Sequence, residues 1–353
     1  MSKFSVLALV AAATLVGRTF ALSEEAASFL LSERFDKFKN DFQKVYEPGE
    51  HAERLKHFEN NMEKIASLNA KLRAAGKDAV HGITRFADMS DEEFQGMLGI
   101  DSRYTPKAQV IDSSNNLDDM NGTPTDSFNW MDEGKLTPIK DQGQCGSCWA
   151  FSAVSTIESV WAINGHELTE FSPQQVVSCD KEDGGCKGGL PGNAFDYVKK
   201  TGGLATAESY PYKSGKDGSN HMCHLFFKKS GGTISEWGYA HTPCTGYEQK
   251  PCVEDSSSIA SALKKYGPLS VGLDASNFQH YTEGIFESSE CSDKPRNMNH
   301  AVQLVGYNTD HIVPYWIVRN SWTKDWGEDG FIKLKMGDNA CGLLNIPALI
   351  KAI

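Results

Sequence analysis

Residues 142–149 read Gln-Gly-Gln-Cys-Gly-Ser-Cys-Trp, so Cys145 and Cys148 stand three positions apart. Apolar residues then recur at helical spacing: Phe151, Val154, Ile157 and Trp161. This pattern places Cys148 where a helix begins. The unpaired N–H groups and the macrodipole of a helix N-terminus lower the pKa of a thiol, and the thiolate is the reactive form. The octapeptide therefore favours Cys148 as a nucleophile.

Three other roles fit a Cys-x-x-Cys pair: a structural disulfide, half of a zinc site, or a redox dithiol. Zinc knuckles normally come in pairs or with closely spaced histidines, and no second Cys-x-x-Cys occurs among the nine cysteines. A redox dithiol would leave His300 and Asn320, considered below, without a role. We therefore interpret Cys148 as a nucleophile, because this role also gives His300 and Asn320 a function.

Length and charge narrow the class of protein. At 353 residues the chain is long enough for one large core or two domains. The formal net charge of −11 argues against a nucleic acid or an anionic membrane as partner, because both reward a basic face. The hydrophobic share of 40% is typical of a globular protein.

The N-terminus has the pattern of a secretory signal peptide. Residues 4–16 are almost wholly apolar, and a small-residue step ends at Ala21. This run is too short to span a bilayer, and no later segment is long enough. We therefore predict a signal peptide at residues 1–21 and entry into the secretory pathway. In that oxidising compartment eight of the nine cysteines can pair, which leaves one free thiol.

Residues 22–80 are charged, free of cysteine and helical in pattern. A first helix carries an aromatic face: Phe35, Phe38, Phe42 and Tyr46. A second helix carries one stripe of six residues: Glu50, Arg54, Phe58, Asn61, Ile65 and Asn69. Ion pairing along an ordinary amphipathic helix would explain the charged members. Two asparagines suit a plain core poorly, so the stripe indicates specific contacts. Residues 82–88 alternate as in a short strand, and an acidic helix start follows.

Residues 101–125 are rich in Ser, Asn, Asp, Thr and Pro and have no period, which predicts an exposed connector open to proteolysis. They include a glycosylation sequon at Asn121. All nine cysteines and all seven tryptophans lie beyond this connector. The C-terminal part is helix-rich at first and strand-rich after residue 231. This order predicts an α+β fold of two lobes with a cleft at their seam.

Two motifs supply partners for Cys148. His300 precedes the apolar run 301–305, and Asn320 opens Asn-Ser-Trp after the apolar run 315–318. A single histidine is more often structural, and Asn-Ser is also an ordinary turn. Together they provide a base and an amide that orients the base, with Trp322 as a cover against water.

These motifs, in this order, resemble the papain-like cysteine proteases, the family of papain and of cathepsins L and H, over nearly everything after residue 21. The resemblance implies the two-lobed papain-like fold, with a helical N-terminal lobe, a β-barrel-like C-terminal lobe and a cleft between them. It implies that Cys148 is the nucleophile, His300 the base and Asn320 its orienting partner. Gln142 and the Cys148 backbone N–H would donate to the oxyanion. No metal or cofactor is implied.

The resemblance extends to the helical segment. The six-residue stripe matches the family's propeptide motif, and residues 82–88 resemble a second one, with Thr84 where asparagine is common. We therefore expect a preproenzyme: a signal peptide at 1–21, an inhibitory propeptide at 22–123 and a mature peptidase domain at 124–353. The propeptide would pack on the strand-rich lobe and run through the cleft in reverse.

The resemblance also implies disulfides and substrate contacts. The implied pairs are Cys145 with Cys186, Cys179 with Cys223, Cys291 with Cys341 and, as an extra local bridge, Cys244 with Cys252. Backbone contacts would come from Gly188 and Gly189. The pocket for the residue two positions upstream of the cut bond would be formed by Leu190, Pro191, Gly272, Met298, Ala301 and Ile346. Because this pocket is apolar, we expect Leu, Val or Phe to be preferred over Arg.

We thus expect a monomeric cysteine endopeptidase of the secretory pathway, either lysosomal or vacuolar or extracellular, whose partners are peptide and protein substrates and its own propeptide. Cys148 and His300 would rest as a thiolate–imidazolium pair. A catalytically dead relative that serves as a binding module is the rival, although all four catalytic positions are present. Residues 189–195 also resemble cathepsin H, an aminopeptidase. The sequence does not name the substrate.

Overall fold

The computed structural model describes residues 24–100, 127–224, 230–244 and 256–352. The expected signal peptide, the connector with its sequon at Asn121, and Cys252 lie outside these residues. The described residues form two compact units. The first comprises the chain up to Phe94 together with Gln279–Gly284, and the second comprises Gln95–Phe278 and the chain from Ile285 onward. Among the described residues, no helix is long and apolar enough to cross a membrane.

The first unit is built on two long helices, α1 (Glu24–Asp41) and α2 (His51–Ala74), and the start of α3 (Asp91–Gly96). Phe35 and Phe38 of the predicted aromatic face lie on α1 and pack on α2, whereas Phe42 and Tyr46 follow the helix, which ends at Asp41. The rings of Phe35 and Phe38 lie 5.3 and 5.1 Å from that of Phe58, and all three are buried. Such ring pairs add about 0.5–1.5 kcal/mol each beyond the apolar area that they bury.

The two asparagines of the α2 stripe bind backbone groups. Asn61 Nδ2 donates to the carbonyls of Ala87 and Met89, both at 2.8 Å. Asn69 donates to the carbonyl of His81 at 2.7 Å and accepts from its N–H at 3.1 Å. These bonds satisfy backbone groups that a sheet would otherwise pair. The short strand predicted at residues 82–88 is therefore wrong, and turns occupy most of this stretch.

Residues Gln279–Gly284 pair with this same stretch of the first unit. The N–H of Gly82 donates to the carbonyl of His280 at 2.8 Å, and the N–H of Thr282 donates to the carbonyl of Val80 at 2.9 Å. Thr84 Oγ1 donates to the carbonyl of Gln279. Thr84, which stands where asparagine is common in the second motif, thus binds a residue far along the chain.

His280 makes the stability of the first unit dependent on pH. Its side chain is buried, and neither ring nitrogen bonds a described residue. Burial, together with nearby Lys64 and His81, lowers the pKa of His280 to about 3, and Asp91 opposes this shift. Between this value and the ordinary pKa of about 6.5, the unfolded chain binds a proton that the folded unit does not. Stability is therefore complete above pH 6.5 and falls as the pH drops toward 3.

The first unit loses stability between pH 7.5 and pH 5, and we predict that this loss is ~2 kcal/mol smaller in His280→Leu than in the wild type. Amide exchange along α2 at the two pH values measures the opening free energy. The same substitution at exposed His51 is the control, because an exposed histidine carries no such penalty. Equal pH dependence in the wild type and His280→Leu would refute the assignment.

The described residues of the second unit form four further α-helices and a mainly antiparallel eight-stranded sheet. The helices are α4 (Cys148–Ile163), α5 (Pro173–Cys179), α6 (Pro191–Thr201) and α7 (Ser256–Tyr266). The strands are β1 (Phe128–Asn129), β2 (Ile234–Tyr239), β3 (Leu269–Leu273), β4 (Ile285–Phe286), β5 (His300–Asn308), β6 (Tyr315–Arg319), β7 (Phe331–Lys335) and β8 (Ala348–Ala352). Short 3-10 turns lie at Gly185–Lys187, Phe278–His280, Ser288–Glu290, Pro295–Asn297 and Ala340–Gly342.

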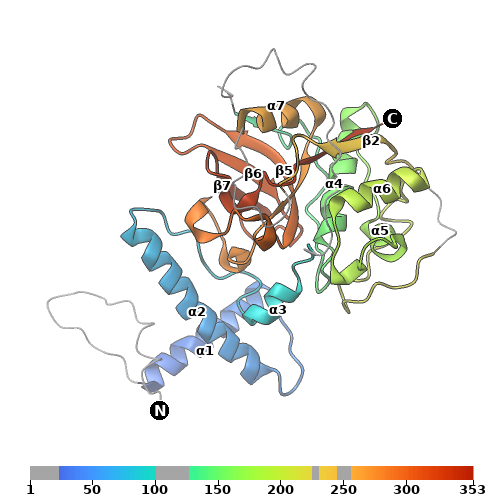
Figure 1. Cartoon of the computed structure of the whole chain (residues 1–353). Coiled ribbons are helices and arrows are strands. Elements are labelled where there is room, and N and C mark those ends of the chain that lie inside the picture. The colour runs from blue at the N-terminus through green and yellow to red at the C-terminus, as the bar shows by residue number, and fades with distance from the viewer. Residues whose placement is uncertain (1–23, 101–126, 225–229, 245–255, 353) are drawn as a thin grey trace. The chain divides into compact units, whose positions relative to one another are not determined.

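Helices and strands separate within the second unit. Helices α4, α5 and α6 lie on one side, and β5, β6 and β7 lie on the other (Figure 1). The sheet order is β2-β8-β3-β5-β6-β7-β4, with β1 beside β5. The predicted α+β class with a helical part and a strand-rich part is confirmed. Helix α4 is buried on nearly every face, because it packs against α6, β5 and β8 at the centre of the unit.

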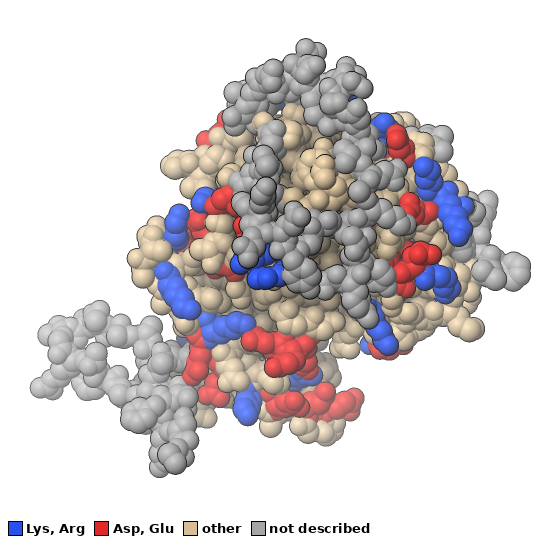
Figure 2. All heavy atoms as spheres, in the orientation of Figure 1, with Lys and Arg blue, Asp and Glu red and all other residues tan. Residues whose placement is uncertain are grey.

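Three disulfides connect described residues: Cys145–Cys186, Cys179–Cys223 and Cys291–Cys341. Cys148 is free and buried. The expected Cys244–Cys252 bridge includes a residue outside the described ranges. Acidic and basic side chains both occur across the face shown in Figure 2.

Candidate active site

Cys148 is the first residue of α4, and its side chain is fully buried. Its Sγ accepts a hydrogen bond from the backbone N–H of Ala301 at 3.4 Å. Ala301 directly follows His300, so the start of β5 brings the thiol and the imidazole to one place. Burial raises the pKa of the Cys148 thiol to about 11, although the backbone N–H groups of Ala301 and Gly99 act to lower it.

His300 and Asn320 meet because β5 and β6 are antiparallel neighbours, so the start of β5 lies beside the residue that follows β6. His300 Nε2 and Asn320 Oδ1 are 2.8 Å apart. The same Oδ1 accepts the N–H of Ser321 at 2.8 Å, which orients the amide oxygen toward the imidazole and makes Nε2 the donor. The Trp322 ring stacks on His300 with 4.6 Å between centroids. The tryptophan therefore shields this hydrogen bond from water.

The expected thiolate–imidazolium pair is not the favoured state in this structure. Burial lowers the pKa of His300 to about 4, and the hydrogen bond to Asn320 only partly opposes this shift. With the thiol pKa near 11, both groups are neutral at pH 7. His300 Nδ1 is buried and bonds no described residue. Desolvation causes both pKa shifts, because a buried site disfavours the thiolate and the imidazolium alike.

Gln142 is held in one orientation by the residues that follow Asn320. Its Oε1 accepts from Ser321 Oγ at 2.8 Å and from Trp322 Nε1 at 3.2 Å. Its Nε2 therefore points the other way and donates to the carbonyls of Met97 at 2.8 Å and Cys145 at 3.0 Å. The sequence did not reveal Ser321 as a support for Gln142. An amide N–H that already binds a peptide carbonyl is the kind of donor that can stabilise an oxyanion.

Residues 97–100 leave α3 through a turn at Met97 and lie against this site. The N–H of Gly189 donates to the carbonyl of Gly99 at 2.9 Å, and the N–H of Ile100 donates to the carbonyl of Asn299 at 2.9 Å. Ile100 forms a parallel bridge with Gly189. A side chain at position 99 would collide with the backbone of Gly146. Gly99 thus brings two stretches of backbone into close contact.

The predicted pocket residues gather around Ile100. A Cβ on Gly272 would lie 2.9 Å from Cδ1 of Ile100 and of Ile346, and it would collide with Met298. The missing side chain at position 272 therefore leaves the space that Ile100 fills. Leu190 and Ala301 belong to the same buried cluster. Pro191 is the first residue of α6, and Gly188 has a positive φ of 108° just before Gly189. The structure thus brings all eight expected substrate contacts to one region.

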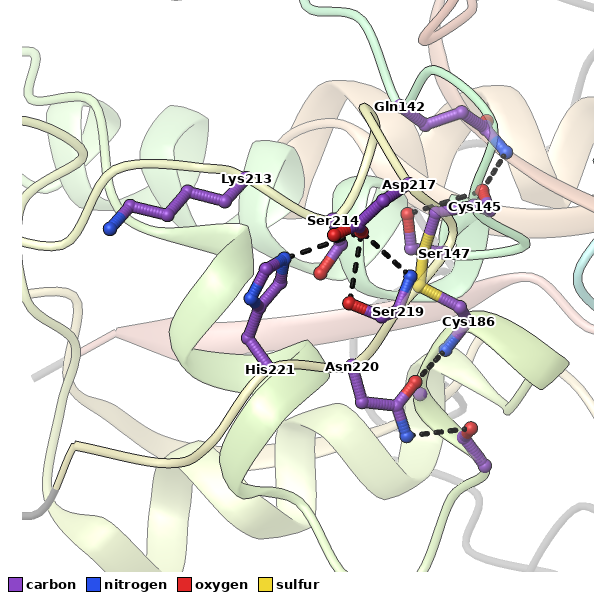
Figure 3. Close-up of a disulfide and its surroundings, with 12 residues drawn as sticks. Gln142, Cys145, Ser147, Cys186, Lys213, Ser214, Asp217, Ser219, Asn220 and His221 are labelled. Atoms are coloured by element: carbon purple, nitrogen blue, oxygen red, sulfur yellow. Dashed lines mark hydrogen bonds and ion pairs between the residues drawn. A yellow bond between two sulfur atoms is a disulfide. The ribbon is translucent and has the colours of Figure 1, made fainter.

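Asp183 supports the loop that includes Gly188 and Gly189, a role that no sequence pattern indicated. Its Oδ1 accepts from the N–H of Leu190 at 3.2 Å and from Asn193 Nδ2 at 2.9 Å. Burial raises the pKa of Asp183 to about 7; the hydrogen bond from Asn193 opposes this shift, and the nearby Asp180 carboxylate contributes to it. The Cys145–Cys186 disulfide joins the same loop to the octapeptide (Figure 3). Among the described residues, no group of His, Cys, Asp or Glu is arranged to hold a metal ion.

Residues 124–349 match the family described as papain family cysteine protease. The chain belongs to the papain family of cysteine proteases. Residues 35–94 match the cathepsin propeptide inhibitor domain (I29), so this papain-family protease carries its own inhibitory propeptide and is made as a zymogen. The resemblance seen in the sequence is confirmed, and so is the papain-like fold.

Relatives of this papain-family protease share both parts of the chain. It is 39% identical over 316 residues to a cysteine proteinase of Trypanosoma brucei brucei. This alignment covers 88% of this chain and 65% of that protein. It is 35% identical over 341 residues to cysteine proteinase 1 of Dictyostelium discoideum, with 91% of each chain covered. The structure of digestive procathepsin L2 proteinase from Tenebrio molitor larval midgut matches with a TM-score of 0.77 at 28% identity, over 91% of this chain and 99% of that chain.

Proposed function

We propose that this zymogen yields a cysteine endopeptidase whose catalytic residues are Cys148, His300, Asn320 and Gln142. The observation that carries the proposal is the hydrogen bond between Gln142 Nε2 and the carbonyl of Met97. A peptide carbonyl thus already lies at the amide that would receive an oxyanion. The Cys148 thiol accepts a hydrogen bond from the N–H of Ala301, which follows His300, and His300 is bonded to Asn320.

The reaction follows from these positions. His300 takes the proton of the Cys148 thiol, and the thiolate attacks the carbonyl carbon of the peptide bond. The negative oxygen receives hydrogen bonds from Gln142 Nε2 and the Cys148 N–H. His300 then gives its proton to the departing amine, and a thioester remains. A water molecule, deprotonated by His300, hydrolyses the thioester and restores the thiol. Asn320 keeps Nε2 bonded, so Nδ1 faces the thiol throughout.

Latency follows from residues 97–100, which contact the same catalytic residues. Ile100 forms a parallel bridge with Gly189, which supports a propeptide that runs opposite to a substrate. We propose that conversion removes this segment, that solvent then reaches Cys148 and His300, and that the ion pair forms once burial no longer disfavours it. The proposed boundaries remain 1–21, 22–123 and 124–353.

Specificity is proposed to depend on the pocket that Ile100 fills. Met298, Ala301 and Ile346 make this pocket apolar, so a buried guanidinium would have no partner there. We propose that Leu, Val or Phe is preferred two positions upstream of the cut bond. We further propose a monomer that acts in the secretory pathway, in a lysosome or vacuole or outside the cell, at acidic pH.

We predict that the converted enzyme cleaves peptides with Leu at that position at least about tenfold better than peptides with Arg, as kcat/KM. Ile346→Glu should reverse this order, because a carboxylate would pair with the guanidinium. Ile346→Leu is the matched control and should keep the preference. Measured kcat/KM values for a peptide set that differs only at this residue test the proposal. A wild-type preference for Arg would rule out the pocket assignment.

A further inference from the structure

A loop that follows Tyr210 lies against the octapeptide and carries a buried hydroxyl. Tyr212 Oη donates to the backbone carbonyl of Gln142 at 2.8 Å. The same oxygen lies 2.8 Å from Ser147 Oγ. A tyrosine hydroxyl has one proton, and Tyr212 donates it in the hydrogen bond to the Gln142 carbonyl. Ser147 Oγ is therefore the donor in the second bond. One atom thus joins the residue before Cys148 to the residue that presents the oxyanion amide.

The ring and the backbone of this loop leave that hydroxyl little freedom. The Tyr212 ring packs edge-on against Phe151, at 4.8 Å between centroids, one turn along α4. The carbonyl of Gly215 accepts the N–H of Gln144 at 2.9 Å, and a side chain on Gly143 would collide with Gly215. Burial raises the pKa of Tyr212 well above its ordinary range, so the hydroxyl stays protonated at any working pH.

The far end of the loop is hydrogen-bonded to residues 184–186, next to Gly188 and Gly189. Asn220 Oδ1 accepts the N–H of Cys186 at 2.7 Å, and its Nδ2 donates to the carbonyl of Gly184 at 3.2 Å (Figure 3). Asp217 shapes the loop between by accepting from the N–H and hydroxyl of Ser219 at 3.0 and 2.9 Å. The loop therefore connects residues 142–147 to residues 184–186 independently of the Cys145–Cys186 disulfide.

We propose that Tyr212 is a positioning residue for catalysis, which sets the spacing between the Gln142 side-chain amide and the Cys148 backbone N–H through its two hydrogen bonds. Tyr212 acts through Gln142 and Ser147. The inference rests on the proposed roles of Gln142 and Cys148 in the reaction. If the spacing is what Tyr212 controls, its loss affects steps in which an oxyanion forms and leaves other reactions of the thiol unchanged.

The test is Tyr212→Phe in the converted enzyme, which removes one oxygen and keeps the ring. Loss of a whole oxyanion donor costs about 100- to 1,000-fold in kcat, so displacement of a donor should cost on the order of tenfold. We expect kcat to fall about tenfold with KM unchanged. The inhibition constant of a peptide aldehyde, which binds as a tetrahedral thiol adduct bearing an oxyanion, should rise by the same factor. Alkylation of Cys148 by iodoacetamide, which forms no oxyanion, should keep its rate.

Tyr210→Phe, two residues before Tyr212, is the matched control. Its hydroxyl accepts from the N–H of His224 at 3.2 Å and donates to the carbonyl of Met222 at 3.4 Å, so its loss should leave kcat and the aldehyde constant unchanged. Wild-type kcat and aldehyde binding in Tyr212→Phe would overturn the inference. So would an alkylation rate that falls in step with kcat, because the role would then be general packing. A wild-type enzyme without turnover would instead overturn the proposed function itself.

Discussion

Replacement of Cys148 by alanine is expected to lower kcat for peptide hydrolysis by at least about 10⁴-fold, because the nucleophile of a Cys-His-Asn site is lost. The fold should persist, since the substitution removes one buried sulfur atom from the start of α4. The variant should also remain full-length at acidic pH if conversion is self-catalysed. Initial rates on a fluorogenic peptide and gel analysis of the chain measure both effects.

The control for this variant is Ser155→Ala, two turns along α4. It removes one heteroatom from a buried side chain of the same helix, so it matches the size of the change at Cys148. Activity should stay close to that of the wild type. If Cys148→Ala kept more than about a hundredth of wild-type turnover, another residue would have to be the nucleophile.

The second large effect is expected at Gly99, where a valine should raise the peptidase activity of the unconverted proenzyme by about 10- to 100-fold. A side chain there collides with backbone atoms of Gly146, which have no rotamer to change. Overpacking of this kind costs about 1–3 kcal/mol. The equilibrium constant for binding of residues 97–100 over Cys148 falls by the factor that corresponds to this energy. Rates on a small peptide at neutral pH, with the chain shown to be full-length on a gel, measure the effect.

Gly96→Val supplies a matched control only three residues away. A Cβ at position 96 meets no atom within 4 Å, so the segment should keep its place and the proenzyme should stay latent. Equal latency of Gly99→Val and the wild type would mean that residues 97–100 do not limit access to the thiol.

Local signals explain why much of the site could be predicted from the sequence. The helix start at Cys148, the apolar strand after His300 and the Asn-Ser-Trp turn each follow from a few neighbouring residues. The stripe on α2 was found because helical periodicity places Asn61 and Asn69 on one face.

The features that were missed depend on contacts between residues far apart in the chain. Turns occupy most of residues 82–88 in place of a predicted strand, and Asn61 binds the carbonyl of Ala87 in this stretch. Tyr212 and Asp183 lie in irregular loops whose partners no periodicity identifies.

The protonation state of the site was also beyond reach of the sequence. The neutral forms of Cys148 and His300 result from complete burial, and residues 97–100 contribute through the Gly99 N–H beside the thiol and the Met97 carbonyl on Gln142. A helix N-terminus alone favours the thiolate, whereas desolvation in the covered cleft outweighs it. The sequence motifs thus predict the ionised Cys148 and His300 of the active enzyme, whereas the structure contains their neutral forms in the latent chain.

The most direct test of the account is the rate at which iodoacetamide modifies Cys148 before and after conversion, with the modified residue located by mass spectrometry. We predict that Cys148 in the full-length chain stays unmodified at neutral pH, because its thiol is buried and protonated. After residues 97–100 are removed, the same thiol should react to completion, and turnover should fall in proportion. Equal modification of both forms, or loss of turnover with the label on another residue, would contradict the account.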